Sequence, residues 1–318
     1  MAHYLVTGGC GFIGSHLVDA LLEQGNDVRI LDNLSSGHRE NASSRAELMI
    51  GDVADRVAVR DAVRDVDGVF HLAAVASVER SNDDWVGTHV TNLSGAITVF
   101  DAARNLRGDG PIPVVYASSA AIYGHNEHVP LVEEDMPQPM TAYGADKLGC
   151  ELHARIASTI HGVPTVGLRF FNVYGSRQDP SSPYSGVISI FCERIMSGVP
   201  LSIYGDGEQV RDFIHVSDVV RLTMKAMSTP MVGGEVFNVC TGKGTTVREL
   251  VDIVAELCQV SPDIIYRDPR SGDVRMSVGN PARAFQKFGV QARTPFAEGL
   301  RDTLASTRER QALHRRYA

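Results

Sequence analysis

The sequence lacks the features of several large protein classes. Its five cysteines are an odd number with no CxxC or metal-like spacing, so we expect reduced thiols and a cytoplasmic protein rather than a disulfide framework. No apolar run approaches the roughly 20 residues that cross a bilayer, and no signal peptide is expected before the first strand. The net charge is -8, and without a basic excess a nucleic-acid partner is disfavoured.

A metal-binding motif is also missing. HExxH is absent, and the one short cluster of histidine and glutamate, at 125–128, follows Tyr123-Gly124 with no further ligands nearby in sequence. We interpret this cluster as a solvated loop and expect no metal.

The first half of the chain alternates strand-like and helix-like segments. This alternation predicts a Rossmann-type, doubly wound α/β fold with a parallel sheet. Apolar stripes at helical spacing predict long helices over 84–105 and 142–161. Ligands of such folds bind at the carboxyl ends of the strands.

The pattern changes after residue 170, where Gly, Pro and Ser cluster. We expect a first domain over 1–170 and a smaller C-terminal α/β substrate lobe over 171–318, with part of 210–240 packing back on the large sheet. A helix at 186–197, a strand at 236–239 and a helix at 247–258 are assigned to the lobe.

A glycine-rich turn carries the first functional signal. Gly8, Gly11 and Gly14 follow a strand-like segment and open a helix, which is the setting of a dinucleotide-binding fingerprint. Glycine lets the backbone turn tightly, and a helix N-terminus offers N–H groups to a pyrophosphate.

Acidic residues after the next two strands complete the expected cofactor site. Asp32 stands 18 residues after Gly14, where a carboxylate accepts hydrogen bonds from ribose hydroxyls and repels a 2′-phosphate. This favours NAD over NADP, and Asp52 is suited to the adenine amino group. The other residues expected near NAD are Phe12, Ile13, Asn33, Ser36, Gly37, Val53, Leu72, Ala73, Ala74, Asn92 and Phe170.

Tyr143 and Lys147 form the candidate reactive centre. They are four residues apart on a predicted helix and therefore share one face. A free phenol is a poor base at neutral pH, but an adjacent ammonium and a positive nicotinamide ring both favour the phenolate. Ser119 follows the fifth strand, where its hydroxyl could align a substrate hydroxyl with this base.

These motifs resemble the extended short-chain dehydrogenase/reductase family over nearly the whole chain. Within it, the chain is most similar to nucleotide-sugar 4-epimerases acting on UDP-glucose or UDP-N-acetylglucosamine. The segments that carry the resemblance are GGCGFIG at 8–14, HLAA at 71–74, SSAAIYG at 118–124, YGADK at 143–147, RFFNVYG at 169–175, YGDGEQVRDFIHVSDV at 204–219 and RSGDV at 270–274.

Two details of the resemblance refine the expected reaction. Family dehydratases carry acidic residues just after the catalytic Ser or Thr, whereas this chain has Ala120 and Ala121. Ser277 stands where enzymes acting on N-acetylhexosamines have a small residue and glucose-only relatives a bulky aromatic one. The resemblance therefore implies a 4-epimerase whose cavity has room for a 2-acetamido group.

The resemblance also implies a set of substrate contacts. Arg211 and Arg270 would bind the diphosphate. Asn172 would contact the sugar or its phosphate, and Gln178 would contact the N-acetyl group. Asp273 would lie near the uridine ribose and Tyr204 near the uracil. Ser77 and Val187 complete the expected set.

The expected activity is therefore NAD-dependent 4-epimerisation of UDP-hexoses through a 4-keto sugar, catalysed by Ser119, Tyr143 and Lys147. The alternatives are a UDP-glucuronate 4-epimerase or another nucleotide-sugar reductase or dehydratase, and, from a different class, a non-catalytic NAD-sensing protein. A homodimer through the helices at 84–105 and 142–161 is expected by resemblance.

Overall fold

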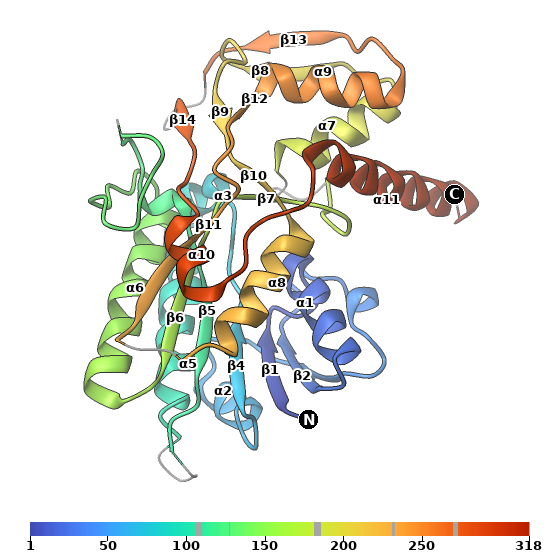
Figure 1. Ribbon diagram of the computed structural model, residues 1–318. Coiled ribbons are helices and arrows are strands. Elements are labelled where there is room, and N and C mark those ends of the chain that lie inside the picture. Colours follow the sequence, from blue (N-terminus) through green and yellow to red (C-terminus); the bar gives the residue numbers. More distant parts are fainter. Residues whose placement is uncertain (106–109, 127, 181–185, 231–232, 270–272, 318) are drawn as a thin grey trace.

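The structure is a computed structural model that describes residues 1–105, 110–126, 128–180, 186–230, 233–269 and 273–317 (Figure 1). Within these residues, the largest sheet has seven parallel strands in the order β11-β6-β5-β4-β1-β2-β3. The strand order reverses between β1 and β4, and ligands of open α/β sheets bind at such a switch point. The strands are β1 (His3–Thr7), β2 (Asp27–Asp32), β3 (Glu47–Ile50), β4 (Gly68–His71), β5 (Val114–Ser119), β6 (Thr165–Phe170) and β11 (Glu235–Val239).

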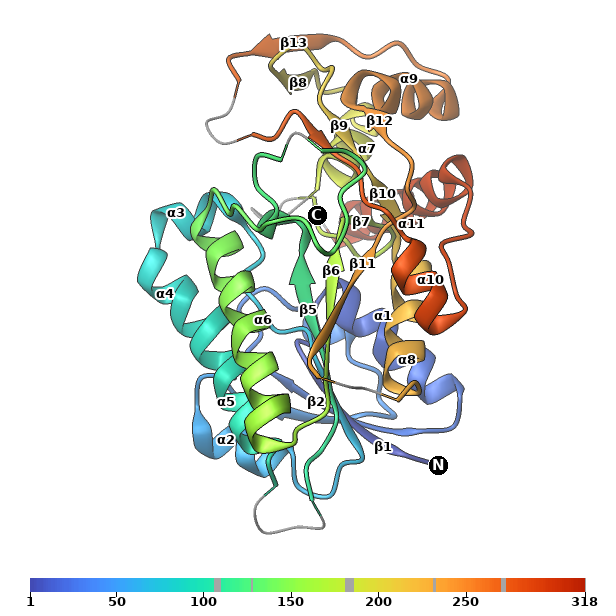
Figure 2. The same ribbon diagram turned by 60° about the vertical axis from the view of Figure 1, so that its left-hand side comes forward.

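Helices cover both faces of this sheet, as the turned view shows (Figure 2). One face carries α1 (Phe12–Glu23), α8 (Val216–Met227) and α10 (Ala282–Phe288), whose apolar side chains share one buried cluster with the sheet. The opposite face carries α2 (Arg56–Ala62), α5 (Gly95–Ala102) and α6 (Ala142–His161) over a second cluster. The predicted doubly wound α/β fold is confirmed.

The predicted helix over 84–105 is wrong in its detail. After α3 (Val78–Asp83), the chain forms α4 (Trp85–His89), a π-helical turn η2 (Val90–Ser94) and then α5, which ends at Ala102. A π turn inserts an extra residue into the helix, and a stripe of apolar residues does not reveal it.

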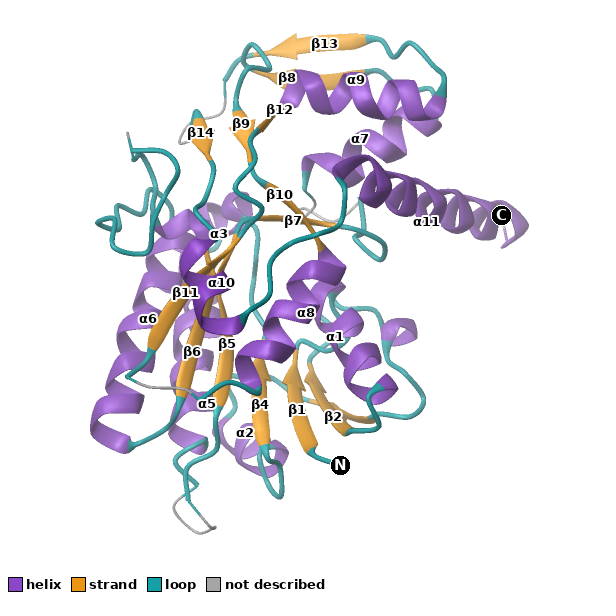
Figure 3. Cartoon of the chain, in the orientation of Figure 1, coloured by secondary structure: helices purple, strands orange, loops and turns teal. Residues whose placement is uncertain are grey.

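A second lobe lies over the carboxyl ends of the sheet strands, as the strand arrows show (Figure 3). Helices α7 (Val187–Met196), α9 (Val247–Cys258) and α11 (Phe296–Tyr317) pack there around their own apolar cluster. Small sheets complete the lobe and link it to the large sheet: β7 (Asn172–Tyr174) with β10 (Phe213–His215), β8 (Leu201–Tyr204) with β13 (Ile264–Arg267), and β9 (Val210–Arg211) with β12 (Thr245–Thr246) and β14 (Met276–Ser277). Two short 3-10 helices, η1 (Arg39–Asn41) and η3 (Ala120–Ile122), stand in loops.

The strand predicted at 236–239 does not belong to the second lobe. It is β11, which pairs in parallel with β6 at the edge of the large sheet and buries Phe237 and Val239 in that sheet's core. Helix α8 likewise packs against α1. The chain thus returns to the large sheet after building part of the lobe, and a boundary at residue 170 stays a prediction.

None of the described helices combines the length and the apolar character that a membrane span requires.

Candidate active site

A cavity of about 620 Å³ lies between the carboxyl edge of the large sheet and the second lobe. We call it the sheet-edge cavity. It brings together residues from the N-terminal glycine turn, from α6 and from the second lobe. The expected residues that line it are Gly8, Gly11, Phe12, Ile13, Gly14, Asp32, Asn33, Ser36, Gly37, Val53, Leu72, Ala73, Ala74, Ser119, Tyr143, Lys147, Phe170, Asn172, Gln178, Arg211, Asp273 and Ser277.

The glycine turn is packed too tightly for side chains. Gly8 has a φ of +72°, and a Cβ there would lie 2.8 Å from the backbone nitrogen of Ala73. At Gly14 a Cβ would lie 2.1 Å from the carbonyl oxygen of Gly8. Helix α1 starts directly after Gly11 with no side-chain cap, so its first N–H groups are free to bind an anion. The turn can therefore hold a pyrophosphate against backbone.

Asp32 is buried at the end of β2 beside this turn. Its Oδ2 accepts a hydrogen bond from the Cys10 backbone N–H (2.9 Å), and its Oδ1 accepts one from that of Leu34 (2.8 Å). An ionised carboxylate accepts about four hydrogen bonds, so capacity remains for two ribose hydroxyls. These bonds fix the carboxylate at the cavity wall. They also place it beside the Cys10 thiol, whose pKa is raised to about 11 by burial and by the Asp32 charge.

Helix α6 carries the phenol and the ammonium into the sheet-edge cavity. Thr141 caps the helix by accepting a hydrogen bond from the Gly144 N–H (3.1 Å). Lys147 is buried, and its Nζ lies 5.8 Å from the centroid of the Tyr143 ring. The same Nζ donates to the carbonyl oxygen of Ala117 on β5 (2.9 Å). The spacing of four residues thus puts both groups on one helix face, with the ammonium held in place by the sheet.

Ser119 ends β5 at the same cavity. Its Oγ accepts a hydrogen bond from the Ala121 N–H (3.1 Å) and caps η3, which leaves its hydroxyl proton available to a ligand. Ala120 and Ala121 also line the cavity. Neither methyl group can exchange a proton, so the wall beyond Ser119 offers no side-chain acid or base from these two positions.

Arg211 reaches the cavity from β9 in the second lobe. Burial lowers the pKa of its guanidinium, and the neighbouring carboxylate of Asp273, with which it forms an ion pair, opposes this shift. Its Nη1 also donates to the carbonyl oxygen of Val210 (2.8 Å), and the remaining guanidinium N–H donors can bind phosphate oxygens. Asp273 was expected near a ribose, and the structure places it as the partner of Arg211.

His71 is buried at the end of β4, next in sequence to Leu72 of the cavity wall. Its Nδ1 is 2.8 Å from the Oγ1 of Thr7. Burial, followed by the positive charge of Lys147, lowers the pKa of His71 to about 3. The lowered pKa favours the neutral ring at physiological pH.

Some expected residues lie outside the cavity wall. Asp52 accepts a hydrogen bond from the Asn33 side chain (2.8 Å), and Asn92 in η2 bonds both the N–H and the carbonyl of Val75. Ser77 caps α3, Val187 opens α7, and Tyr204 lines a separate surface depression beside Asp273. Arg270 lies outside the described residues.

Sequence reasoning missed several residues of the cavity wall. Thr141 had a local signal, because a threonine just before a helix is a common cap. Ser118 stands in the SSAAIYG segment at 118–124 but was given no role there, and Arg177 had no local signal that separates it from a surface arginine. Other wall residues for which no role was expected are Leu31, His38, Asn41, Gly51, Val75, Ala76, Thr91, Ala117, Gly124, Leu131, Met140, Phe171, Val173, Asp179, Gly186 and Val274.

Among the described residues, no group of three or more His, Cys, Asp or Glu side chains is arranged to hold a metal ion. Glu127 of the cluster at 125–128 lies outside those residues.

Known proteins resemble this chain over most of its length. The UDP-glucose 4-epimerase of Mycolicibacterium smegmatis is 37% identical over 316 residues, which cover 94% of this chain and 96% of that protein. The structure of the Thermotoga maritima UDP-glucose 4-epimerase with UDP-glucose matches with a TM-score of 0.93 at 37% identity, over 97% of this chain and 99% of that one. A UDP-N-acetylglucosamine 4-epimerase from Methanobrevibacter ruminantium M1, in complex with UDP-N-acetylmuramic acid, matches with a TM-score of 0.91 at 36% identity, with the same coverage.

A family profile agrees with these likenesses. Residues 4–240 match the NAD dependent epimerase/dehydratase family, a span that includes the glycine turn, Ser119, Tyr143 and Lys147. The resemblance to extended short-chain dehydrogenases/reductases is thereby confirmed. The chain belongs to the NAD dependent epimerase/dehydratase family of enzymes, whose cofactor is NAD.

Proposed function

We propose that this protein is an NAD-dependent 4-epimerase of UDP-hexoses that works through a 4-keto sugar. The observation that carries the proposal is the meeting of Ser119, Tyr143 and Lys147 in the cavity that also contains the glycine turn. Ala120 and Ala121 beside them favour epimerisation over dehydration, because water loss requires an additional acid and base.

The cavity wall fits NAD. The glycine turn leaves room for a pyrophosphate, Asp32 can accept from ribose hydroxyls, and Leu72, Ala73 and Ala74 allow a flat ring to approach the backbone. When bound, NAD supplies a reversible acceptor for the hydride of sugar carbon 4.

The side chains of this protein then handle the proton. Tyr143 takes the proton of the 4-hydroxyl as the sugar is oxidised and returns it after the sugar has turned over. Ser119 holds that hydroxyl in line with the phenol. Lys147 stabilises the negative oxygen of Tyr143, because its buried ammonium is fixed near the ring.

The second lobe holds the nucleotide while the sugar turns. Arg211 binds the diphosphate, with Asp273 orienting its guanidinium, and Asn172 contacts the sugar or its phosphate. Arg270, Tyr204, Ser77 and Val187 remain proposed substrate contacts by resemblance alone. Anchoring at the diphosphate leaves the hexose as the mobile part of the substrate.

Ser277 and Gln178 suggest that the sugar can carry an N-acetyl group. Both line the cavity, and the small side chain of Ser277 leaves space that an aromatic ring would fill. We expect Ser277→Tyr to lower kcat/KM for UDP-N-acetylglucosamine by at least tenfold while changing that for UDP-glucose less, measured with both substrates in parallel. An equal loss for the two sugars would exclude this role of Ser277.

A direct test uses the purified protein without added cofactor. Incubation with UDP-glucose, UDP-N-acetylglucosamine or UDP-glucuronate, followed by NMR of the products, should show inversion at carbon 4 for one or both uncharged sugars. A stable keto or dehydrated product, or a need for stoichiometric NADH, would refute the proposal. Turnover of UDP-glucuronate alone would favour the alternative substrate.

We further propose that the protein is a homodimer. Trp85, Val86 and Val90 along α4 and η2, and Leu152, Ile156 and Ile160 on α6, are exposed large apolar side chains of the kind that a second copy would cover. Ile156→Glu should give a monomer in analytical ultracentrifugation, whereas Val57→Glu, at an exposed apolar residue on α2, should not change the oligomer. A wild-type monomer would contradict the proposal.

We also propose a cytoplasmic location. All five cysteines are free, and four of them are buried, as suits a reducing compartment. A fusion to a fluorescent protein would test this location, and a signal outside the cytoplasm would refute it.

A further inference from the structure

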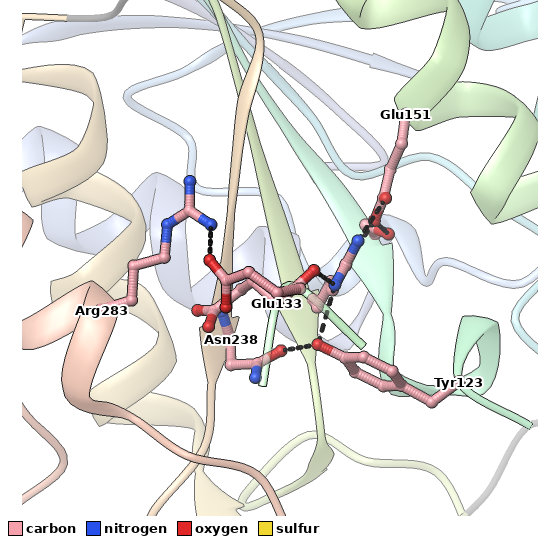
Figure 4. A network of polar contacts seen from close by, with 8 residues as sticks. Tyr123, Glu133, Glu151, Asn238 and Arg283 are labelled. Atoms are coloured by element: carbon pink, nitrogen blue, oxygen red, sulfur yellow. Dashed lines mark hydrogen bonds and ion pairs between the residues drawn. The ribbon is translucent and has the colours of Figure 1, made fainter. Parts of the chain in front are cut away.

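A buried polar network begins at Ser118, a wall residue of the sheet-edge cavity. Figure 4 shows this network from close by. Its centre is the ion pair between Glu151 of α6 and Arg169 of β6, both almost fully buried. The guanidinium binds the carboxylate through two bonds, Nε to Oε1 (2.9 Å) and Nη2 to Oε2 (2.8 Å). Ser118 of β5 donates its hydroxyl to the same Oε1 (2.5 Å). One carboxylate thus joins a helix to two strands.

Glu151 lies on the same helix as two of the proposed catalytic residues. Tyr143, Lys147 and Glu151 follow one another at intervals of four residues, so they share one face of α6. The first two reach the cavity and the third reaches the core below it. Ser118, which Glu151 binds, directly precedes Ser119.

Helix α6 is consequently joined to β5 at two successive levels. Lys147 donates to the carbonyl of Ala117, and Glu151 accepts from the hydroxyl of Ser118. Two contacts at different heights along a helix restrict both its rotation and its sliding against the strand. They therefore fix where the Tyr143 phenol stands relative to Ser119.

Further hydrogen bonds fix the Arg169 guanidinium on the side that does not contact Glu151. Its Nη1 donates to the Tyr123 hydroxyl (2.8 Å) and to the Glu133 carbonyl (3.0 Å). Figure 4 shows the Tyr123 hydroxyl turned toward the side chain of Asn238, to which it donates (2.6 Å). With both ends of the guanidinium engaged, the carboxylate of Glu151 has a rigid partner.

We propose that Glu151, held by Arg169 and bonded to Ser118, is a positioning residue for the Ser119, Tyr143 and Lys147 set. The proposal rests on the proposed function and deepens it. Buried ion pairs contribute little net stability compared with apolar packing, so stability alone is a weak reason for an ion pair at this place. Catalytic groups must be held within about 0.5 Å of their productive geometry, and a network tied to rigid strands can supply that precision.

The test compares two buried hydroxyls that bond α6 to the sheet. Ser118→Ala removes the bond to Glu151, which lies about two turns beyond Tyr143 at the middle of α6, and leaves the ion pair intact. Thr165→Val removes the bond from Thr165 Oγ1 to the Ala154 carbonyl (3.0 Å) farther along α6, and Thr165 is equally buried. The quantities to compare are kcat, KM and the midpoint of thermal unfolding of each variant, as the purified, NAD-loaded protein.

Ser118→Ala should lower kcat by about tenfold or more with little change in KM, because a misplacement of about 1 Å can cost a hundredfold. Thr165→Val should lower the midpoint of thermal unfolding about as much as Ser118→Ala does. Its kcat should nevertheless stay within about twofold of wild type. Equal kcat values for the two variants would overturn the proposal. If Ser118→Ala does not fold, Ser118→Cys replaces it, because a thiol is a weaker hydrogen-bond donor to Glu151 than a hydroxyl. Its kcat should be lower than that of wild type, and its KM should be unchanged.

Crystal structures of the same variants separate this proposal from the proposed function. In Ser118→Ala the Tyr143 hydroxyl should shift relative to the Ser119 Oγ by about 0.5 Å or more, and in Thr165→Val it should not. If the wild-type protein epimerises no UDP-hexose, the proposed function fails while this shift still decides the positioning role. An unmoved Tyr143 in Ser118→Ala would refute that role whatever the activity.

Discussion

The ammonium of Lys147 lies 5.8 Å from the centre of the Tyr143 ring while donating a hydrogen bond to β5. This contact fixes a positive charge next to a phenol that opens on the sheet-edge cavity. A lysine on a solvated helix face would instead be screened by water and free to move. The relationship explains why the tyrosine is the proposed base.

Removal of the phenolic oxygen should abolish most of the activity. We expect Tyr143→Phe to lower kcat by about 10² to 10⁴, the range that general acid–base groups contribute. NAD content, measured after denaturation of the purified protein, should change little, because the glycine turn and Asp32 remain. Full activity of the variant would assign the proton transfer to another group.

Tyr116→Phe is a matched control for Tyr143→Phe, because Tyr116 is a buried tyrosine on β5 that does not line the cavity. Within the described residues its hydroxyl has no hydrogen-bond partner. Tyr116→Phe should therefore retain kcat and raise the free energy of unfolding by about 1 kcal/mol, because a buried unpaired hydroxyl is lost. Tyr123→Phe should lower that free energy by about 1–3 kcal/mol, since it strips Arg169 and Asn238 of a partner. Chemical denaturation measures both, and effects of equal sign would contradict this reasoning.

The glycine turn predicts a graded steric effect. A Cβ at Gly14 would lie 2.1 Å from the Gly8 carbonyl oxygen, whereas one at Gly11 would lie 3.2 Å from the same atom. Gly14→Ala should therefore force the backbone apart, lower the melting temperature and lose bound NAD. Gly11→Ala should lower the melting temperature less. The reverse order in thermal unfolding would show that the turn packs differently.

The sequence predicted the parts of the site that depend on local spacing. The Gly8–Gly14 turn and the Tyr143–Lys147 interval each lie within one strand–turn–helix or helix segment, and the structure places them along one cavity. Asp32 was recognisable because it follows a strand at a set distance from that turn. Local geometry determines where such residues stand, so one sequence is enough to find them.

The features of the fold and of the site that the sequence did not predict depend on contacts between segments that are distant in sequence. The sequence allowed part of 210–240 to pack back on the large sheet, but it did not identify β11 as a strand of that sheet, because an apolar run does not reveal its pairing partner, here β6. Two-residue strands such as β9 and β12 exist only through their pairing. The link between Tyr123 and Asn238 joins residues 115 positions apart, and no local pattern announces such a bond.

Stability should fall with acid in a way that depends on His71. Burial and the Lys147 charge lower the pKa of His71 to about 3 in the folded protein, below the usual 6.5 that it regains on unfolding. Above about pH 6.5 the ring is neutral in both states, and its contribution is complete. Between about pH 6.5 and 3 only the unfolded chain takes up the proton, so this contribution is lost by up to about 1.4 kcal/mol per pH unit. The difference in unfolding free energy between wild type and His71→Asn should therefore shrink from pH 7 to pH 5 in urea titrations. A constant difference would mean that the folded protein accepts the proton.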